Sequence, residues 1–252
     1  MKKYFGAAAA CATVLFLASF CLAQDKDWRP IDPEDLKSTK PVVEPDADAE
    51  AIFYEARIDD SSDSDISTKY YIRVKIYTER GREKYSKFDI PFVKGIKIKD
   101  LAARVIKPDG SIVEISKDDI FEREIVKTSG VKIKAKSFAV PNIEPGVIVE
   151  YRYKETIEDA GATGRRLEFQ RDIPARSIAY YYKPYEGREP VYRTYNFNDV
   201  KFIKDKGGYY VAKRTNVPAF KEERDMPPED MVKPWIRLGF GMTFAKLFGK
   251  VE

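Results

Sequence analysis

The 252-residue chain contains no histidine, and its two cysteines, Cys11 and Cys21, both lie near the N-terminus. Without histidine, no serine–histidine or cysteine–histidine nucleophile pair can form, and the commonest zinc ligand is missing. Catalytic mechanisms that use carboxylate, lysine, tyrosine or Ser and Thr hydroxyl groups remain available. We therefore expect no catalytic, metal-binding or cofactor-binding residues. We also expect no charge switch between pH 5 and 8, where histidine ordinarily titrates.

The N-terminal segment has the pattern of an export signal. Two lysines precede an uncharged stretch from Tyr4 to Ala23, after which charged residues begin abruptly. We expect residues 1–23 to be a signal peptide cleaved after Ala23, with export to the periplasm or the cell exterior. Two alternatives remain open: an uncleaved membrane anchor of bilayer-spanning length, and a lipoprotein attached at Cys21, although Phe20 stands where a small residue is usual. Cleavage would remove both cysteines, so that the mature chain could form no internal disulfide.

Charge is distributed unevenly along the chain. Residues 24–66 contain 14 acidic and 5 basic residues, a net charge of −9, whereas the residues from Ser67 onward carry a net charge of +11. The acidic part could dock on the basic part, or the basic part could face an anionic partner. Because an exported protein does not meet nucleic acid, we expect an unknown envelope protein or a polysaccharide as the partner, with no small-molecule cofactor.

The segment after the signal predicts an extended acidic arm over residues 24–50. It is rich in Asp, Glu and Pro, and we expect at most a short helical turn after Pro33. Alternation of apolar and polar residues then begins, which is typical of half-buried antiparallel strands. In the next alternating stretch, we expect the even-numbered side chains from Tyr70 to Ile76 to face the core and the odd-numbered ones from Tyr71 to Tyr77 to face outward.

A hairpin is predicted where residues 101–106 and 111–115 flank Lys107–Gly110. Its proline presets φ for the turn, and its glycine accepts a positive φ. Ser116 is a candidate N-cap for a polar helical segment that runs toward Glu124. Further strand-like segments are 52–58, 131–136, 138–140, 147–154, 166–171, 177–183, 191–197, 200–204 and 209–214.

Many short strands without a sustained helical period predict an all-β fold. We expect an antiparallel β-sandwich of Ig-like or jelly-roll-like architecture, preceded by the extended arm. We assign residues 51–220 to this domain. Residues 221–252 are assigned to a charged, proline-rich linker and a truncated C-terminal segment, in which residues 235–240 are strand-like.

A stripe of basic residues occupies every second position at Lys132, Lys134 and Lys136. One interpretation is a solvated strand face, or an edge strand that its lysines protect against pairing with another sheet. The functional alternative is an anion-binding stripe.

A run of tyrosines is the strongest candidate for contact with a ligand or partner. On a strand, Tyr180 and Tyr182 share one face and Tyr181 takes the other, with Tyr192 and Tyr195 nearby in sequence. Exposed tyrosines would offer amphipathic area to a sugar ring or a protein. In the alternative interpretation both faces are covered, one by the core and one by the arm or a neighbouring domain. Four nearby arginines are expected to be solvated: Arg165, Arg166, Arg171 and Arg176.

Two carboxylates, Glu144 and Glu150, flank a glycine turn and could form an acid–base pair. Glu150, however, shares its strand face with Arg152 and Lys154. A cross-strand ion pair is therefore the simpler interpretation.

Four motifs occur in order along the chain: Asp46–Glu50, Lys107–Gly110, Phe138–Pro141 and Glu144–Tyr151. Together they make the sequence resemble the domain of unknown function 3857 family, which is found ahead of transglutaminase-like domains in bacterial secreted and envelope proteins. The resemblance covers roughly residues 28–235 and implies a β-sandwich.

The resembling proteins usually continue into a papain-like domain with a Cys-His-Asp triad. This sequence ends before such a domain and has no mature cysteine or histidine to build it, so their amide chemistry is not carried over. We expect either a free-standing accessory domain or the N-terminal remnant of a longer protein.

Three hypotheses for function follow. The first is a non-catalytic, exported accessory or interaction domain. The second is a carbohydrate-binding module that uses exposed tyrosines. The third is a carboxylate-based hydrolase.

Overall fold

The computed structural model describes residues 28–61, 65–128, 131–158 and 164–239, and the chain divides into two units, residues 1–31 and 32–252. In the first unit, residues 28–31 form no helix or strand. The expected signal peptide lies outside the described residues. Within those residues, no helix has the length and apolar character needed to cross a membrane.

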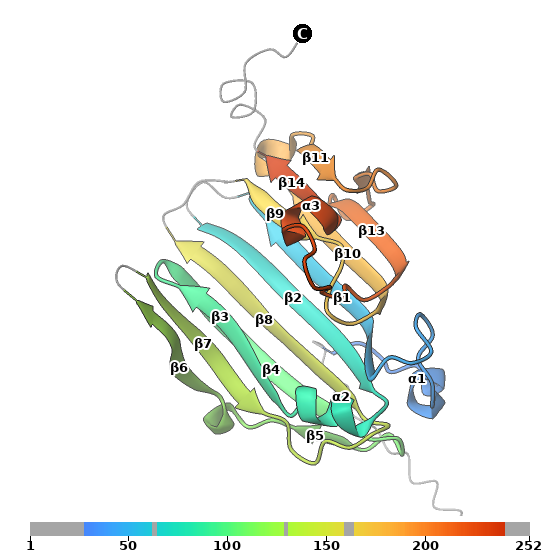
Figure 1. The fold of residues 1–252 in the computed structure, drawn as a ribbon. Coiled ribbons are helices and arrows are strands. Elements are labelled where there is room, and N and C mark those ends of the chain that lie inside the picture. Colours follow the sequence, from blue (N-terminus) through green and yellow to red (C-terminus); the bar gives the residue numbers. More distant parts are fainter. Residues whose placement is uncertain (1–27, 62–64, 129–130, 159–163, 240–252) are drawn as a thin grey trace, which may run out of the picture. The chain divides into compact units, whose positions relative to one another are not determined.

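The second unit is built mostly of strands, as the alternation predicted (Figure 1). The largest sheet, called the main sheet, has eight strands in the order β12-β13-β10-β1-β2-β8-β4-β5. These strands are β12 (Ile203–Lys204), β13 (Tyr210–Val217), β10 (Ala175–Lys183), β1 (Ala49–Asp59), β2 (Asp65–Ile76), β8 (Ile148–Glu158), β4 (Ile96–Ile106) and β5 (Ile112–Glu114). The β1–β10 pair is parallel, which departs from the purely antiparallel sheet expected, whereas the other pairs of described strands are antiparallel.

Two three-stranded sheets accompany the main sheet. The first, in the order β3-β7-β6, consists of β3 (Lys87–Val93), β7 (Val131–Ala139) and β6 (Phe121–Thr128). The second, in the order β11-β14-β9, consists of β11 (Val191–Tyr195), β14 (Trp235–Gly239) and β9 (Arg165–Glu168). The charged and proline-rich residues 221–234 therefore lead into the central strand of a sheet, which pairs on both sides.

The helices are short: α1 (Pro33–Lys37), α2 (Glu79–Lys84), α3 (Glu229–Val232), η1 (Lys117–Asp119) and η2 (Tyr185–Gly187). The α1 helix is the expected turn after Pro33, and the Asp32 carboxylate caps it by accepting from the Glu34 N–H. Ser116 also caps as expected, but only a single 3₁₀ turn follows, and β6 begins at Phe121. The longer helix expected toward Glu124 was wrong, because these residues pair with β7 instead.

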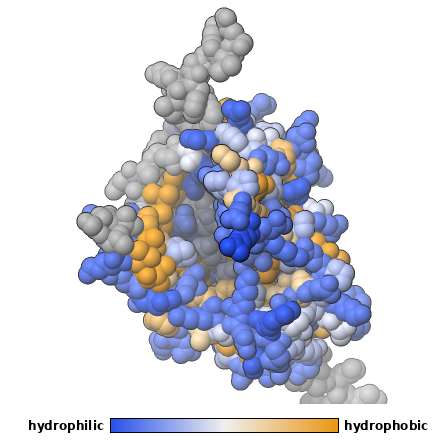
Figure 2. Space-filling model, viewed as in Figure 1, coloured by the Kyte–Doolittle hydropathy of each residue, from blue (hydrophilic) through white to orange (hydrophobic). Residues whose placement is uncertain are grey.

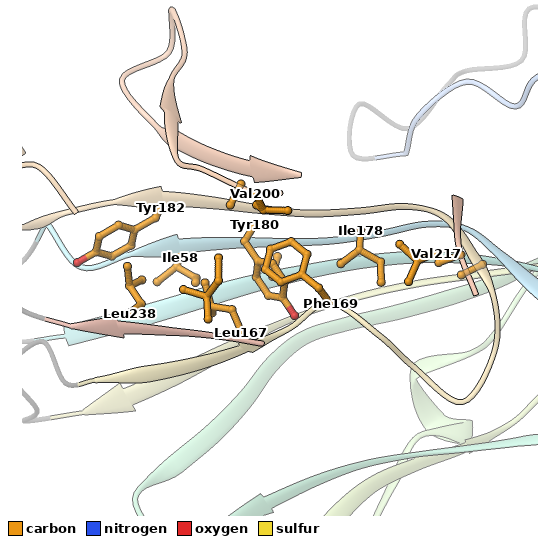
Figure 3. Packing of buried hydrophobic residues seen from close by; sticks show 14 residues of the cluster. Ile58, Leu167, Phe169, Ile178, Tyr180, Tyr182, Val200, Val217 and Leu238 are labelled. Atoms are coloured by element: carbon orange, nitrogen blue, oxygen red, sulfur yellow. The ribbon is translucent and has the colours of Figure 1, made fainter. Parts of the chain in front are cut away.

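The small sheets pack on one face of the main sheet and form two apolar cores. One core joins β1, β10 and β13 to β9 and β14, and Figure 3 shows its packed side chains. The other joins β2, β4 and β8 to β3 and β7. Tyr54 and Tyr70 pack against both cores, so they lie between the parts of the main sheet that the two small sheets cover. The expected inward face of β2 is confirmed, since Ile72, Val74 and Ile76 are all buried.

The hairpin between β4 and β5 forms as predicted. Lys107 N–H donates to the Ser111 carbonyl at 2.9 Å, and Gly110 N–H donates to the Lys107 carbonyl at 2.9 Å. Gly110 has φ of 84°, the left-handed conformation that glycine adopts without strain. The motif Lys107–Gly110 thus marks a turn.

The opposite face of the main sheet carries the odd-numbered side chains of β2, but these are not solvated. Arg73 is 3% exposed and Lys75 is fully buried. The Lys75 ammonium donates to the carbonyls of Leu36 (3.0 Å) and Gly146 (2.6 Å). The outward orientation of these side chains was therefore predicted correctly. Their exposure to solvent was not, because the α1 helix and the loop before β8 supply partners on this face.

One carboxylate ties the arm to the sheet. Glu50 accepts from the N–H groups of Val42 and Val43 through one oxygen, at 2.8 and 2.7 Å. Its other oxygen accepts from Arg176 Nε at 2.5 Å, and Arg176 Nη1 also contacts Asp35 of α1 at 2.6 Å. Arg176 is thus an internal ion-pair partner and not a solvated cation.

Candidate functional site

A cavity of about 390 Å³ opens on the face of the main sheet that carries the small sheets. Figure 2 shows this side of the molecule hollowed over β2 and β8, beside the segment around α3. The main sheet contributes Tyr54, Tyr70, Tyr180 and Glu155 to the wall. The β9 strand and the connection that follows it contribute Arg165, Arg166, Glu168 and Arg171. We call this cavity the tyrosine cleft.

Strand register places the tyrosines of the cleft. Tyr70 on β2 lies directly opposite Tyr153 on β8, and their rings stack with centroids 4.7 Å apart. The Tyr54 ring meets Tyr70 edge-on at 6.2 Å and lies 6.4 Å from Tyr180. All four tyrosines stand on the inward face of adjacent strands, in positions where aliphatic residues fill the rest of the core.

Two tyrosine hydroxyls of the cleft have no hydrogen-bond partner in the described part of the chain. Among the described residues, none makes a hydrogen bond to the hydroxyl of Tyr54 or Tyr70, and neither hydroxyl is sealed from solvent. Burial of the rings raises the pKa of both residues. Both therefore stay protonated near neutral pH and can donate and accept hydrogen bonds in the cavity. Tyr180 differs, since its hydroxyl donates to the Glu168 carbonyl at 2.8 Å.

Arg171 enters the cleft from the connection between β9 and β10. Its Nη2 donates to the Tyr180 hydroxyl at 3.1 Å, and its guanidinium carbon lies 4.0 Å from the centroid of the Tyr54 ring. Its Nε is buried and has no hydrogen-bond partner among the described residues. The expectation that Arg171 is solvated was wrong, because two tyrosines enclose its guanidinium.

The remaining charges of the cleft are mostly paired. Arg165 Nη2 donates to the buried Asp60 at 2.8 Å, and Arg166 Nε lies 3.2 Å from a Glu168 oxygen. Glu155 is half-buried, and desolvation raises the pKa of its carboxyl group. No group of three or more His, Cys, Asp or Glu residues that could hold a metal ion occurs in the described part of the chain.

The run of tyrosines singled out in the sequence divides between the two faces as predicted. Tyr180 and Tyr182 are 4% and 3% exposed, and both belong to the core beneath β9 and β14. Tyr181 lies on the opposite face, where the Arg57 guanidinium stacks on its ring at 3.9 Å. Only Tyr180 reaches the cleft, so the run does not form a continuous binding surface.

The other two predicted tyrosines pack within the chain. Tyr192 meets Phe202 edge-on at 5.0 Å. Tyr195 stacks on Trp235 of β14 with a centroid distance of 3.9 Å and an interplanar angle of 3°. Neither residue lines the tyrosine cleft. Contact of these residues with a ligand stays a prediction.

The lysine stripe forms cross-strand ion pairs with β6. Lys134 and Lys136 contact Glu122 at 2.6 and 3.2 Å, and Lys132 pairs with Glu124. The edge-strand interpretation was wrong, because β7 is the middle strand of its sheet. Since each lysine already has a carboxylate partner, an anion-binding stripe would have to displace Glu122 or Glu124.

Glu150 forms the cross-strand ion pairs that its strand position favoured. Arg73 and Arg104 from the two neighbouring strands bind its two oxygens. Glu144, in the loop before β8, is exposed.

Sequence reasoning missed Tyr54, Tyr70 and Arg171 as a group. The signal available was that tyrosines, and not aliphatic residues, occupy inward positions of three neighbouring alternating stretches at Tyr54, Tyr70 and Tyr153. A row of tyrosines on the core side of a sheet indicates either a wet cavity or a partner for each hydroxyl.

Comparison with solved structures supports the fold. A protein from Parabacteroides distasonis ATCC 8503 described as a "putative protease" has a TM-score of 0.65 and 15% identity, over 76% of this chain and 40% of that one. An M1 zinc metallopeptidase from Deinococcus radiodurans has a TM-score of 0.34 and 10% identity, over 77% of this chain and 44% of that one, and we draw nothing from that likeness. This chain thus spans less than half of either protein, and the first likeness shows the fold alone. No curated protein matches the sequence.

A family model matches residues 62–221, more than half of the chain. The match includes the motifs Lys107–Gly110, Phe138–Pro141 and Glu144–Tyr151, and it includes Tyr70 and Arg171 of the cleft. The family is DUF3857, described as a domain of unknown function with a solved structure. The chain therefore belongs to the DUF3857 family, as its motifs predicted.

Proposed function

We propose that this chain is a non-catalytic accessory domain of an exported bacterial protein and that it binds an envelope saccharide in the tyrosine cleft. The observation that carries the proposal is the pair of hydroxyls on Tyr54 and Tyr70, which border a cavity of about 390 Å³ and have no hydrogen-bond partner among the described residues. A volume of this size suits a small ligand or a short segment of a polymer. Sugar hydroxyls can both donate to and accept from such phenol groups.

Two further features support a binding role over catalysis. The sequence holds no histidine, and its two cysteines lie in the expected signal peptide, so nucleophile–base pairs built on these residues are excluded. The resemblance to domains that precede transglutaminase-like domains favours a role in positioning a longer or associated envelope protein on its target.

Glycan screening with matched variants tests the proposal. Tyr70→Phe removes one hydroxyl and keeps the ring, so we expect about fivefold weaker binding from the loss of one hydrogen bond. Tyr181→Phe is the control, because Tyr181 lies on the opposite face of the main sheet and should leave binding unchanged. Absence of binding to every glycan, or equal effects of the two variants, would reject the saccharide site.

A carboxylate hydrolase is the second candidate, and one observation favours it. Glu155 lines the cleft, and burial raises the pKa of its carboxyl group, which is the usual preparation of a general acid. The wild-type protein would then hydrolyse at least one glycoside of a substrate panel, and Glu155→Gln would abolish that activity. An inactive wild type would leave the binding role alone.

A further inference from the structure

The Arg171 guanidinium differs from the other enclosed arginines of the domain. Arg73, Arg104 and Arg176 each lie within 2.5–2.7 Å of a carboxylate oxygen. Arg171 has no Asp or Glu oxygen within 4.0 Å among the described residues, and its Nε is buried without a partner. Its contacts are the Tyr180 hydroxyl and the Tyr54 ring.

Two acids of the cleft and its border make their close contacts with other arginines. Asp60 is paired with Arg165, and Glu168 is paired with Arg166. The charge of Glu168 also acts on Arg171, but from beyond the 4.0 Å of an ion pair. Glu155 has no Lys or Arg nitrogen within 4.0 Å among the described residues. Desolvation raises the pKa of its carboxyl group, and the charge of Arg165 opposes this rise. An enclosed guanidinium without a carboxylate is costly unless an anion comes to it, because its charge has lost part of its hydration.

We propose that the tyrosine cleft binds a saccharide that carries a carboxylate group, and that Arg171 pairs with this carboxylate while the Tyr54 and Tyr70 hydroxyls bond the sugar. This inference rests on the proposed saccharide-binding function and names the class of its ligand. The planar guanidinium matches a carboxylate in geometry and charge. A doubly charged phosphate fits less well, because Glu155 and Glu168 line the same cavity and would repel the second charge.

The experiment compares galacturonic acid with its methyl ester, which keeps the sugar ring but removes its single negative charge. Binding to the mature protein is measured by calorimetry at low ionic strength, where screening is weak. We expect the acid to bind on the order of tenfold more tightly than the ester, as a charge-assisted hydrogen bond requires. This comparison needs no variant and is therefore independent of any folding defect.

Variants then assign the preference to Arg171. Arg171→Gln should remove the preference for the acid, and Arg171→Lys should keep part of it, since lysine retains the charge without the planar fork. Arg82→Gln on α2 is the control, because Arg82 is exposed and does not line the cavity. Melting curves in the absence of sugar check that each variant is folded.

The outcomes separate this inference from the proposed function. If the ester binds as tightly as the acid and Tyr70→Phe weakens both, the saccharide site stands and the carboxylate inference is overturned. A preference for the acid that survives in Arg171→Gln also overturns it. If neither sugar binds and no other glycan binds, both proposals fall.

Discussion

Arg73 on β2 donates from Nη2 to Oε1 of Glu150 on β8 at 2.6 Å, with both side chains at most 4% exposed. Arg104 on β4 binds the second oxygen of the same carboxylate at 2.7 Å. The Tyr71 hydroxyl also donates to Glu150. One buried carboxylate therefore bridges guanidinium groups from two flanking strands.

Glu150→Ala should lower the free energy of unfolding by about 3–5 kcal/mol, because it leaves two buried guanidinium groups without their shared counter-ion. Urea denaturation of the protein measures this change. Glu144→Ala is the control: Glu144 is exposed in the loop before β8, and we expect a change within about 0.5 kcal/mol. Similar effects of the two substitutions would show that the buried ion pairs do not stabilise the main sheet.

Gly81→Ala should be destabilising by about 1–3 kcal/mol, although alanine normally favours a helix over glycine. An added Cβ would lie 2.3 Å from the carbonyl oxygen of Asp48, which already accepts from the N–H groups of Tyr77 and Thr78. The α2 helix would have to move away from the start of β1. Thermal melting checks the direction.

The control for that prediction is Gly207→Ala, where the nearest atom to an added Cβ is the Asp205 carboxylate at 3.4 Å. We expect a change within about 0.5 kcal/mol there. An unchanged or higher melting temperature of Gly81→Ala would mean that the contact with Asp48 is relieved at little cost.

Local patterns in the sequence were sufficient to predict most strands and which of their faces point toward the core. Alternation over Tyr70–Ile76 fixed the inward side correctly, and the turn residues fixed the β4–β5 hairpin, because both depend on residues that are close in sequence. The cleft could not be predicted in this way. Tyr54, Tyr70 and Arg171 meet only through the strand order β10-β1-β2-β8, which no local pattern specifies.

The burial of charged side chains could not be predicted from the sequence either. Arg73 and Lys75 occupy outward positions, and their charge suggested solvent. They are enclosed because the arm supplies a carbonyl of Leu36 to Lys75 and because β8 supplies Glu150 to Arg73. Partners that lie 39 and 77 residues away determine whether such a side chain is buried.

Ile236→Ala should lower the free energy of unfolding by about 2–5 kcal/mol, as deletion of buried aliphatic atoms does. Ile236 is fully buried on β14, between its neighbours β9 and β11. Ile203→Ala serves as the control, because Ile203 is 71% exposed. Urea unfolding of both variants measures the contrast. A small effect at Ile236 would mean that β14 is dispensable and that the domain ends before it.

Glu155→Gln should stabilise the protein at pH 7, and the gain should disappear toward acid pH. Burial raises the pKa of Glu155 above its ordinary value of 4.5, so the folded state favours the protonated carboxyl. The wild type therefore loses stability as pH rises through this raised pKa, whereas the amide carries no such penalty. Below about pH 4.5 both proteins hold a neutral group in the fold, and their free energies of unfolding should converge.

Hydrogen bonds that lower the pKa of Asp48 and Asp89 act in the opposite sense, since their stabilisation is lost as pH falls. The effects of Asp48 and Asp89 are the same in the wild type and in Glu155→Gln. They therefore cancel in the difference between the two free energies of unfolding. The measurement is the free energy of unfolding in urea at a series of pH values from 4 to 8. Glu114→Gln, at an exposed position on β5, should change it by less than about 0.5 kcal/mol throughout. A Glu155→Gln variant that is less stable than the wild type at pH 7 would mean that the ionised carboxylate makes a favourable contact in the cleft. Such a contact would also count against the argument that Arg171 lacks an internal counter-ion.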